Sequence, residues 1–216
     1  MFARAGWPAF CTLEEDELLR DDKWDCLKKG HRYIFWDSTD VDLRFQPSGA
    51  LNQRMTYNDY YGCNCVKGGV SNQPCGWVRS HNLWCGGMSD TMYQELTGIL
   101  EMQEEFAKAD LQDGKYVAFT MIMDKGYRVT MAAWKHGEQT CIQPVLMEAD
   151  KIFSTEDLIY SSTIASHRAG NERNVNLCKM SGFIKRGVHQ KSKLSRMDDV
   201  WLGWAFMQNF MRMPVV

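Results

Sequence analysis

The 216-residue sequence predicts an α/β fold in which helices flank a mixed central sheet, with α+β as the alternative arrangement. Three observations support this. An aromatic and β-branched run at 33–36 and a nearly all-apolar run at 116–123 each have the length of a strand. Residues 66–70 and 77–84 form a hairpin-like pair around Asn72-Gln73-Pro74-Cys75-Gly76. Apolar residues recur at helical spacing over about 91–109.

The remaining segments complete the predicted order of elements. Residues 14–29 hold seven acids against four bases and predict a solvated helix or a connector, and residues 46–62 are polar and turn-rich. A β-like piece covers 141–146, and a capping box, Ser154 to Asp157, opens a helix that runs to about 180. The last helix, about 198–211, is apolar on nearly every face. We expect an acidic N-terminal segment (1–30) followed by one domain (31–216).

Composition excludes several classes of protein. With 44% hydrophobic residues and a net charge of −2, the chain is neither collagen-like nor a charge-driven disordered protein. It is not a generally basic nucleic-acid coat either, so any contact with DNA must use local basic patches. No apolar stretch reaches the roughly 20 residues that cross a bilayer, and the N-terminus is a poor signal peptide. We therefore expect neither membrane insertion nor secretion.

Four of the eight cysteines are close together in the sequence: Cys63, Cys65, Cys75 and Cys85. A zinc site is one interpretation, but the spacing lacks the paired C-x-x-C knuckles of common structural zinc sites. Buried, inert thiols are the favoured interpretation in a reducing compartment.

Candidate chemistry lies in carboxylates at two predicted strand ends. Asp37 follows the run at 33–36, and Asp124 follows the run at 116–123. If the two strands are adjacent, both carboxylates reach one hard divalent cation, and a pair of such ions promotes phosphoryl transfer. Glu172 is the candidate third ligand, with Arg168 on the same helical face. Spacing alone favours a plain Arg168–Glu172 surface ion pair, and Asp at a strand end also starts turns.

Five short motifs occur in one order over about 33–211. They are Asp37-Ser38-Thr39; Asn52-Gln53-Arg54 with Tyr57 to Tyr60 and Lys67; Gly87-Met88-Ser89-Asp90; Asp124-Lys125-Gly126-Tyr127; and His167-Arg168…Glu172-Arg173…Lys179. In this order the chain resembles the DDE superfamily endonucleases, the transposase domains of the PIF/Harbinger-like group.

The resemblance implies an RNase H-like fold, in which the first and fourth strands bring two Asp together and a later helix carries a Glu. It implies Asp37, Asp124 and Glu172 as catalytic residues that bind Mg²⁺ or Mn²⁺, the cofactor of such enzymes. It also implies DNA as the partner. The basic residues expected to hold its phosphates are Lys67, Lys125, Arg168, Arg173, Lys179, Lys185 and Arg186. Asp90 is a fourth acid in a family motif, although a helix N-cap is its favoured interpretation.

The expected function is therefore a divalent-metal-dependent DNA endonuclease or strand-transfer domain of transposase origin. The alternative is a domesticated or degenerate module that binds DNA or protein without catalysis. Family transposases carry an N-terminal helix-turn-helix, whereas here only about 32 residues precede the first strand, and that segment is acidic overall. That favours a truncated copy or one that depends on a separate DNA-targeting protein. We expect a nuclear location, or a cytoplasmic one if the protein is inactive. The apolar final helix should pack on the sheet, with a homodimer contact as the alternative.

Overall fold

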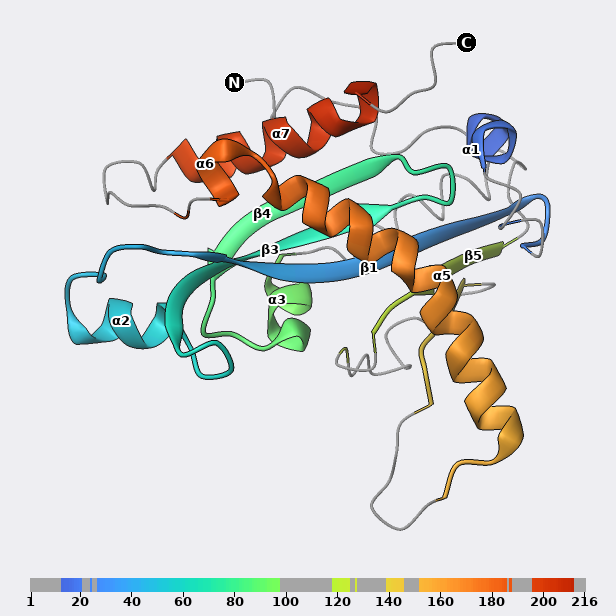
Figure 1. The fold of residues 1–216 in the computed structure, drawn as a ribbon, viewed down its shortest axis with the longest axis horizontal. Coiled ribbons are helices and arrows are strands. Elements are labelled where there is room, and N and C mark those ends of the chain that lie inside the picture. Colours follow the sequence, from blue (N-terminus) through green and yellow to red (C-terminus); the bar gives the residue numbers. More distant parts are fainter. Residues whose placement is uncertain are drawn as a thin grey trace.

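The computed structural model describes residues 13–20, 24, 27–97, 118–124, 127, 139–145, 152–185, 187 and 196–211. Helices and strands follow one another in an α/β order (Figure 1). The elements are α1 (Leu13–Leu19), β1 (His31–Asp42), α2 (Ala50–Thr56), β2 (Tyr57–Asn58), β3 (Cys63–Asn72), β4 (Val78–Cys85), α3 (Asp90–Leu96), β5 (Ala118–Ile122), β6 (Gln139–Ile142), α5 (Thr155–Lys179), α6 (Gly182–Lys185) and α7 (Met197–Met211).

The sheet is mixed, as predicted, and β1 lies at its centre. β1 pairs antiparallel with β3 on one side and parallel with β5 on the other, and β6 continues the sheet parallel to β5. β3 also pairs antiparallel with β4 and, at its first residues, with β2. Because parallel strands cannot be joined by a tight turn, the β1–β5 pair brings together segments that are far apart in the sequence.

Alternate residues of β1 enter cores on opposite faces of the sheet. Ile34 and Trp36 pack with Tyr93 of α3, whereas Tyr33 and Phe35 pack with Ile164 of α5. Farther along the strand, Val41 belongs to a third cluster that includes residues of α5 and α7. Helices α5 and α7 therefore cover one face of the sheet and α3 covers the other (Figure 1).

Helix α7 packs on the sheet, which confirms the expectation for the apolar final helix. Its side chains also satisfy the backbone of β4. The Asn209 amide exchanges two hydrogen bonds with Val78, and Asp198 accepts from the Leu83 N–H at 2.7 Å. A strand with unpaired backbone groups invites aggregation, and these side chains supply partners for that strand. Among the described residues, no helix is both long and apolar enough to cross a membrane.

Several boundaries differ from the sequence prediction. β1 continues to Asp42 because β3 pairs with its polar second half. The turn-rich segment 46–62 contains a short helix and a two-residue strand. β5 and β6 occupy 118–122 and 139–142, close to the predicted positions. The capping box at Ser154 is confirmed by both of its hydrogen bonds. The predicted helix 91–109 is present as α3, and residues beyond 97 lie outside the described part.

The acidic N-terminal segment is not uniformly solvated. Asp16 of α1 is 1% exposed, forms an ion pair with Arg20 at 2.8 Å, and accepts a hydrogen bond from the Cys75 N–H. Trp24 is also buried, with its ring stacked on His167 of α5. A buried carboxylate needs such partners, which the charge count alone does not reveal.

Gly69 of β3 is a point of close approach between the sheet and α3. Its N–H donates to the Tyr93 hydroxyl at 2.6 Å, and a Cβ at this position would overlap the Trp36 indole. We expect Gly69→Ala to lower the free energy of unfolding by about 2–3 kcal/mol, as overpacked core substitutions do. Urea denaturation measures this. Gly203→Ala is the matched control, because nothing lies near its Cβ and Ala favours the helix. Equal stability of the two variants would contradict the packing of Trp36 on Gly69.

Candidate functional site

The candidate site lies where the parallel ladder between β1 and β5 ends. The last pair in that ladder is Phe35 and Ile122. Asp37 lies two residues after Phe35, and Asp124 lies two residues after Ile122. Both aspartates therefore follow the same end of the ladder, at equivalent positions of the two strands. The sequence predicted Asp37 at the end of a strand, and this prediction is wrong. Asp37 lies within β1, at the point where β1 loses β5 as a neighbour and keeps only β3.

Asp124 is held by α5. Arg168 donates from Nη1 to Asp124 Oδ1 at 3.0 Å, with the arginine side chain 11% exposed and the aspartate side chain 40% exposed. Helical spacing favoured a surface ion pair between Arg168 and Glu172. The Arg168 guanidinium instead pairs with Asp124. The reason is tertiary: α5 crosses β1 and presents Arg168 to the end of β5.

Asp37 is partly buried, and its electrostatics connect both sides of β1. The pKa of Asp37 is raised to about 6, first by burial and then by the nearby carboxylates of Asp124 and Asp90. The Ser38 N–H, which donates to Asp37 Oδ1 at 2.8 Å, and the Arg168 guanidinium oppose these effects. Asp37 is thus a carboxyl group whose charge is only partly compensated by its surroundings.

Glu172 is exposed on α5, one turn after Arg168. Within the ranges that the structure describes, no three His, Cys, Asp or Glu side chains are close enough together to hold a metal ion. The structure therefore brings Asp37 and Asp124 to one end of the ladder and leaves Glu172 on the helix that crosses it.

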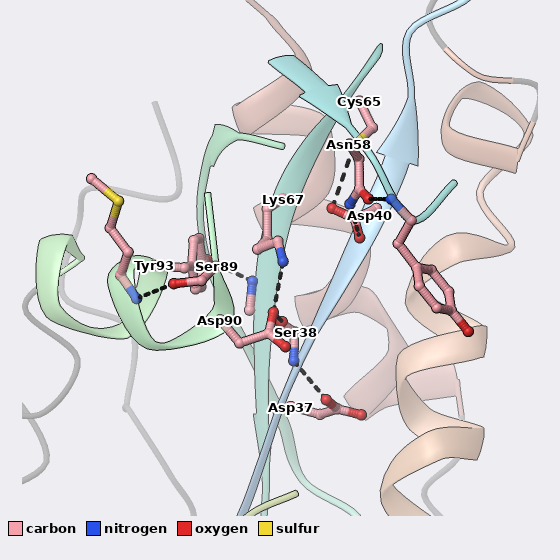
Figure 2. A network of polar contacts seen from close by, with 12 residues as sticks. Asp37, Ser38, Asp40, Asn58, Cys65, Lys67, Ser89, Asp90 and Tyr93 are labelled. Carbon is pink, nitrogen blue, oxygen red and sulfur yellow. Dashed lines mark hydrogen bonds and ion pairs between the residues drawn. The ribbon is translucent and has the colours of Figure 1, made fainter. Parts of the chain in front are cut away.

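A second group of polar contacts lies on the α3 side of β1 (Figure 2). The Ser38 hydroxyl and the Lys67 ammonium both donate to Asp90 Oδ1, at 2.7 Å and 2.6 Å. Ser89, not Asp90, caps α3, because its side chain accepts from the Met92 N–H. The N-cap interpretation of Asp90 is therefore wrong. Asp90 instead connects β1 and β3, since it holds a donor from each strand.

Tyr127 lies behind this group. Its side chain is 1% exposed, and its hydroxyl has no hydrogen-bond partner of normal geometry in the described part of the chain. Burial, followed by the charges of Asp37 and Asp90, raises the pKa of Tyr127 well above its ordinary value.

Asp40 continues the polar row along β1, together with Ser38. Its carboxylate accepts from the Asn58 amide at 3.2 Å and from the Cys65 thiol at 3.4 Å. Burial raises the pKa of Asp40, and the cations of Lys67 and Lys179 oppose the rise. Sequence reasoning did not select Ser38 or Asp40 as site residues. The sequence gives no clear signal for them, because residues 37–40 are all polar and resemble a turn, and only the pairing of β1 with β3 shows that this segment is a strand.

The four cysteines do not form one centre. Cys75 lies in the turn between β3 and β4, at the opposite end of that hairpin from Cys63, Cys65 and Cys85. All four are free thiols. Burial, followed by the charge of Asp40, raises the pKa of Cys65 to about 12. Inert thiols are the better interpretation.

The predicted DNA-binding residues have different environments. Lys67 is 6% exposed and is ion-paired with Asp90, so its ammonium is not presented to a phosphate. Arg168 is bound to Asp124. Arg173 and Lys185 are exposed, and Lys179 is half-buried at the end of α5. Lys125 and Arg186 lie outside the described residues, as does most of the basic segment 185–196.

Comparisons of the chain with family models, with curated proteins and with solved structures found no match.

Proposed function

We propose that the protein is a divalent-metal-dependent DNA endonuclease or strand-transfer domain, with Asp37 and Asp124 as the principal metal ligands and Glu172 as the third. The observation that carries this proposal is the common end of the β1–β5 ladder, from which both aspartates emerge two residues after a paired position. The sheet order supports it as well. β1 lies between an antiparallel β3 and a parallel β5, so that widely separated segments meet at one edge.

Asp37 and Asp124 offer the carboxylate oxygens that a hard divalent cation prefers, and Glu172 would have to approach them to complete a set of three ligands, because the described side chains do not form one. Mg²⁺ and Mn²⁺ prefer carboxylate oxygens and use few protein ligands beside water and phosphate. Asp37 is partly buried, with its pKa raised to about 6, so a nearby cation would supply charge compensation that the protein supplies only in part. Arg168 donates to one carboxylate oxygen of Asp124 and holds this side chain at the end of β5.

The metal would supply activation of the attacking oxygen and stabilisation of the leaving oxygen at phosphorus. The chain's own residues hold the geometry. Arg168 fixes Asp124 against α5, and the Ser38 N–H fixes the orientation of Asp37. Ser38 is in turn held by Asp90, which the Lys67 ammonium neutralises. Arg173, Lys179 and Lys185 are the basic side chains placed to attract the phosphate backbone.

Nicking of supercoiled plasmid DNA in Mg²⁺ or Mn²⁺, with EDTA as the blank, tests this function. We expect Asp37→Asn and Asp124→Asn to reduce cleavage by about a thousand-fold, because losing a metal ligand removes several kcal/mol of transition-state stabilisation. Glu172→Gln should reduce it as well. Glu95→Gln, an exposed change on α3, is the control that keeps full activity. Cleavage that persists in the Asp37 and Asp124 variants, or none in any divalent metal, would exclude the proposal.

One observation favours the alternative of a binding module without catalysis. The Arg168–Asp124 ion pair already compensates one carboxylate without a metal. Titration calorimetry distinguishes the two functions. A folded protein that takes up neither Mg²⁺ nor Mn²⁺ is the non-catalytic module, whereas uptake that Asp37→Asn abolishes belongs to the nuclease.

A further inference from the structure

Three tyrosines are exposed beside the candidate site, on one short stretch of chain. Tyr57 is 44% exposed, Tyr60 is 88% exposed and Tyr61 is 61% exposed. Tyrosine normally buries most of its ring, and exposed aromatic groups of this size commonly mark binding surfaces. The rings of Tyr60 and Tyr61 contact each other edge to face, with centroids 4.9 Å apart.

The turn that carries these tyrosines has a fixed shape. The side-chain oxygen of Asn58 accepts from the N–H groups of Tyr60 and Tyr61, and the Asn58 carbonyl accepts from Gly62. Gly62 adopts a φ of 66°, a left-handed conformation that suits glycine. The backbone that carries the rings is therefore preorganised, and a ligand that binds the tyrosines need not order it.

The turn is attached to the candidate site. The amide group of Asn58 donates to Asp40 of β1 at 3.2 Å, which Figure 2 shows. Tyr61 is close enough to Asp40, Lys67 and Asp90 for their charges to affect its pKa, which burial raises above the ordinary value. The tyrosine turn therefore lies beside the polar contacts of Asp40, Lys67 and Asp90.

Tyr57 also lines a cleft of about 590 Å³ between α2 and the β2–β3 pair. The cleft carries one guanidinium and one carboxylate, from Arg54 and Asp59, and side-chain amides that both donate and accept hydrogen bonds, from Gln46, Gln53 and Asn64. With its formal charges balanced, it is better suited to an uncharged nucleobase edge than to a phosphate.

The cleft is rigid on the side nearest Asp90. The Gly87 N–H donates to the Met55 carbonyl at 2.9 Å, and a Cβ on Gly87 would meet the Met55 and Tyr57 carbonyls at 2.6 Å and 2.9 Å. This contact joins the end of α2 to the connection that leads into α3. The walls of the cleft therefore keep their place relative to the candidate site.

We propose that this cleft and the adjoining Tyr60–Tyr61 turn bind unpaired nucleotides of the DNA substrate, stacking the bases on the tyrosines and reading one base edge with the amides. The inference rests on the proposed function, because it assumes DNA as the partner. It specifies the substrate further: DNA with a single-stranded end or branch binds better than a fully paired duplex. Base–aromatic stacking is a common way to hold single strands without sequence preference.

Fluorescence anisotropy in EDTA, with no cleavage, tests the inference. The probes are a labelled DNA hairpin with a short single-stranded overhang and the same hairpin with a blunt end. We expect the overhang to bind about tenfold more tightly and Tyr60→Ala to remove most of that difference, as loss of one stacked base does. Tyr60→Phe should keep it. Tyr57→Ala should reduce it as well, and the strongly exposed Tyr60 provides a variant that cannot disturb folding.

Tyr160→Ala is the matched control, since Tyr160 of α5 is 47% exposed and lies on a different element. Equal affinity for the two hairpins, or a preference that survives Tyr57→Ala and Tyr60→Ala, would overturn the inference. These outcomes are distinct from failure of the proposed function. If cleavage depends on metal but overhang binding does not depend on the tyrosines, only this inference is excluded. If binding depends on the tyrosines but no metal supports cleavage, only the nuclease function is excluded.

Discussion

Trp201→Ala is expected to lower the free energy of unfolding by about 4–5 kcal/mol, near the upper limit for truncation of a core aromatic. Trp201 is fully buried in the cluster between α7 and the sheet, and its Nε1 donates to the His81 carbonyl at 3.0 Å. Truncation leaves a large cavity and removes the hydrogen bond of that buried carbonyl. Urea denaturation followed by circular dichroism measures the loss.

Two further variants separate the causes. Trp201→Phe keeps most of the packing and loses the hydrogen bond, so it should cost about 1–2 kcal/mol. Trp84→Ala, on the same sheet but 40% exposed, should cost less than Trp201→Ala by at least about 2 kcal/mol. If Trp201→Ala and Trp84→Ala were equally stable, α7 would not pack on the sheet as described.

Asp37→Asn is expected to stabilise the protein at neutral pH by about 1–3 kcal/mol, although it abolishes the proposed activity. Burial, together with the nearby carboxylates, raises the pKa of Asp37 from its usual 3.8 to about 6 in the native state. Between these values the native state binds more protons than the unfolded state, so ionisation of Asp37 lowers the stability of the wild type as the pH rises. Asn has nearly the same shape and never ionises. The difference between the two proteins should therefore be near zero below about pH 4 and reach its maximum above about pH 6.

Denaturation curves of both proteins across this pH range measure the difference. Asp59→Asn, an exposed change in the tyrosine turn, is the control for the effect of an Asp-to-Asn substitution. A divalent metal adds a second readout. Mg²⁺ should raise the stability of the wild type at neutral pH and leave Asp37→Asn unchanged, because a ligand stabilises only the state that binds it. An Asp37→Asn variant that is less stable than the wild type at neutral pH would contradict the conclusion that the charge of Asp37 is only partly compensated by its surroundings.

Much of the fold could be predicted from local sequence. The aromatic run at 33–36, the apolar run at 116–123 and the capping box at Ser154 each define an element without help from neighbours, because strand burial and helix capping depend on adjacent residues. The positions of Asp37 and Asp124 after these runs also predicted their place at one edge. That prediction needed only the assumption that the two strands are neighbours, which the parallel pairing of Phe35 with Ile122 confirms.

Other features could not be predicted, because they depend on which segments meet. The polar sequence from Asp37 to Asp42 resembles a turn, and it is a strand because β3 supplies backbone partners. Lys67 resembles a phosphate-binding side chain, yet it is buried against Asp90, which comes from a different element. Helical spacing paired Arg168 with Glu172, whereas the crossing of α5 over β1 directs the guanidinium to Asp124.

The sequence by itself therefore determined the order of the elements, the α/β class and the two acids at the end of the β1–β5 ladder, since these follow from period, capping and composition. Only the tertiary structure decided the partners of the charged side chains. A charged group in a partly buried site takes whichever opposite charge or hydrogen-bond donor the packing of the chain places beside it, and that neighbour is rarely close in sequence. The tyrosine turn beside Asp40 is a similar case. Its own residues are adjacent in sequence, but its position next to Asp40 depends on the packing of distant segments.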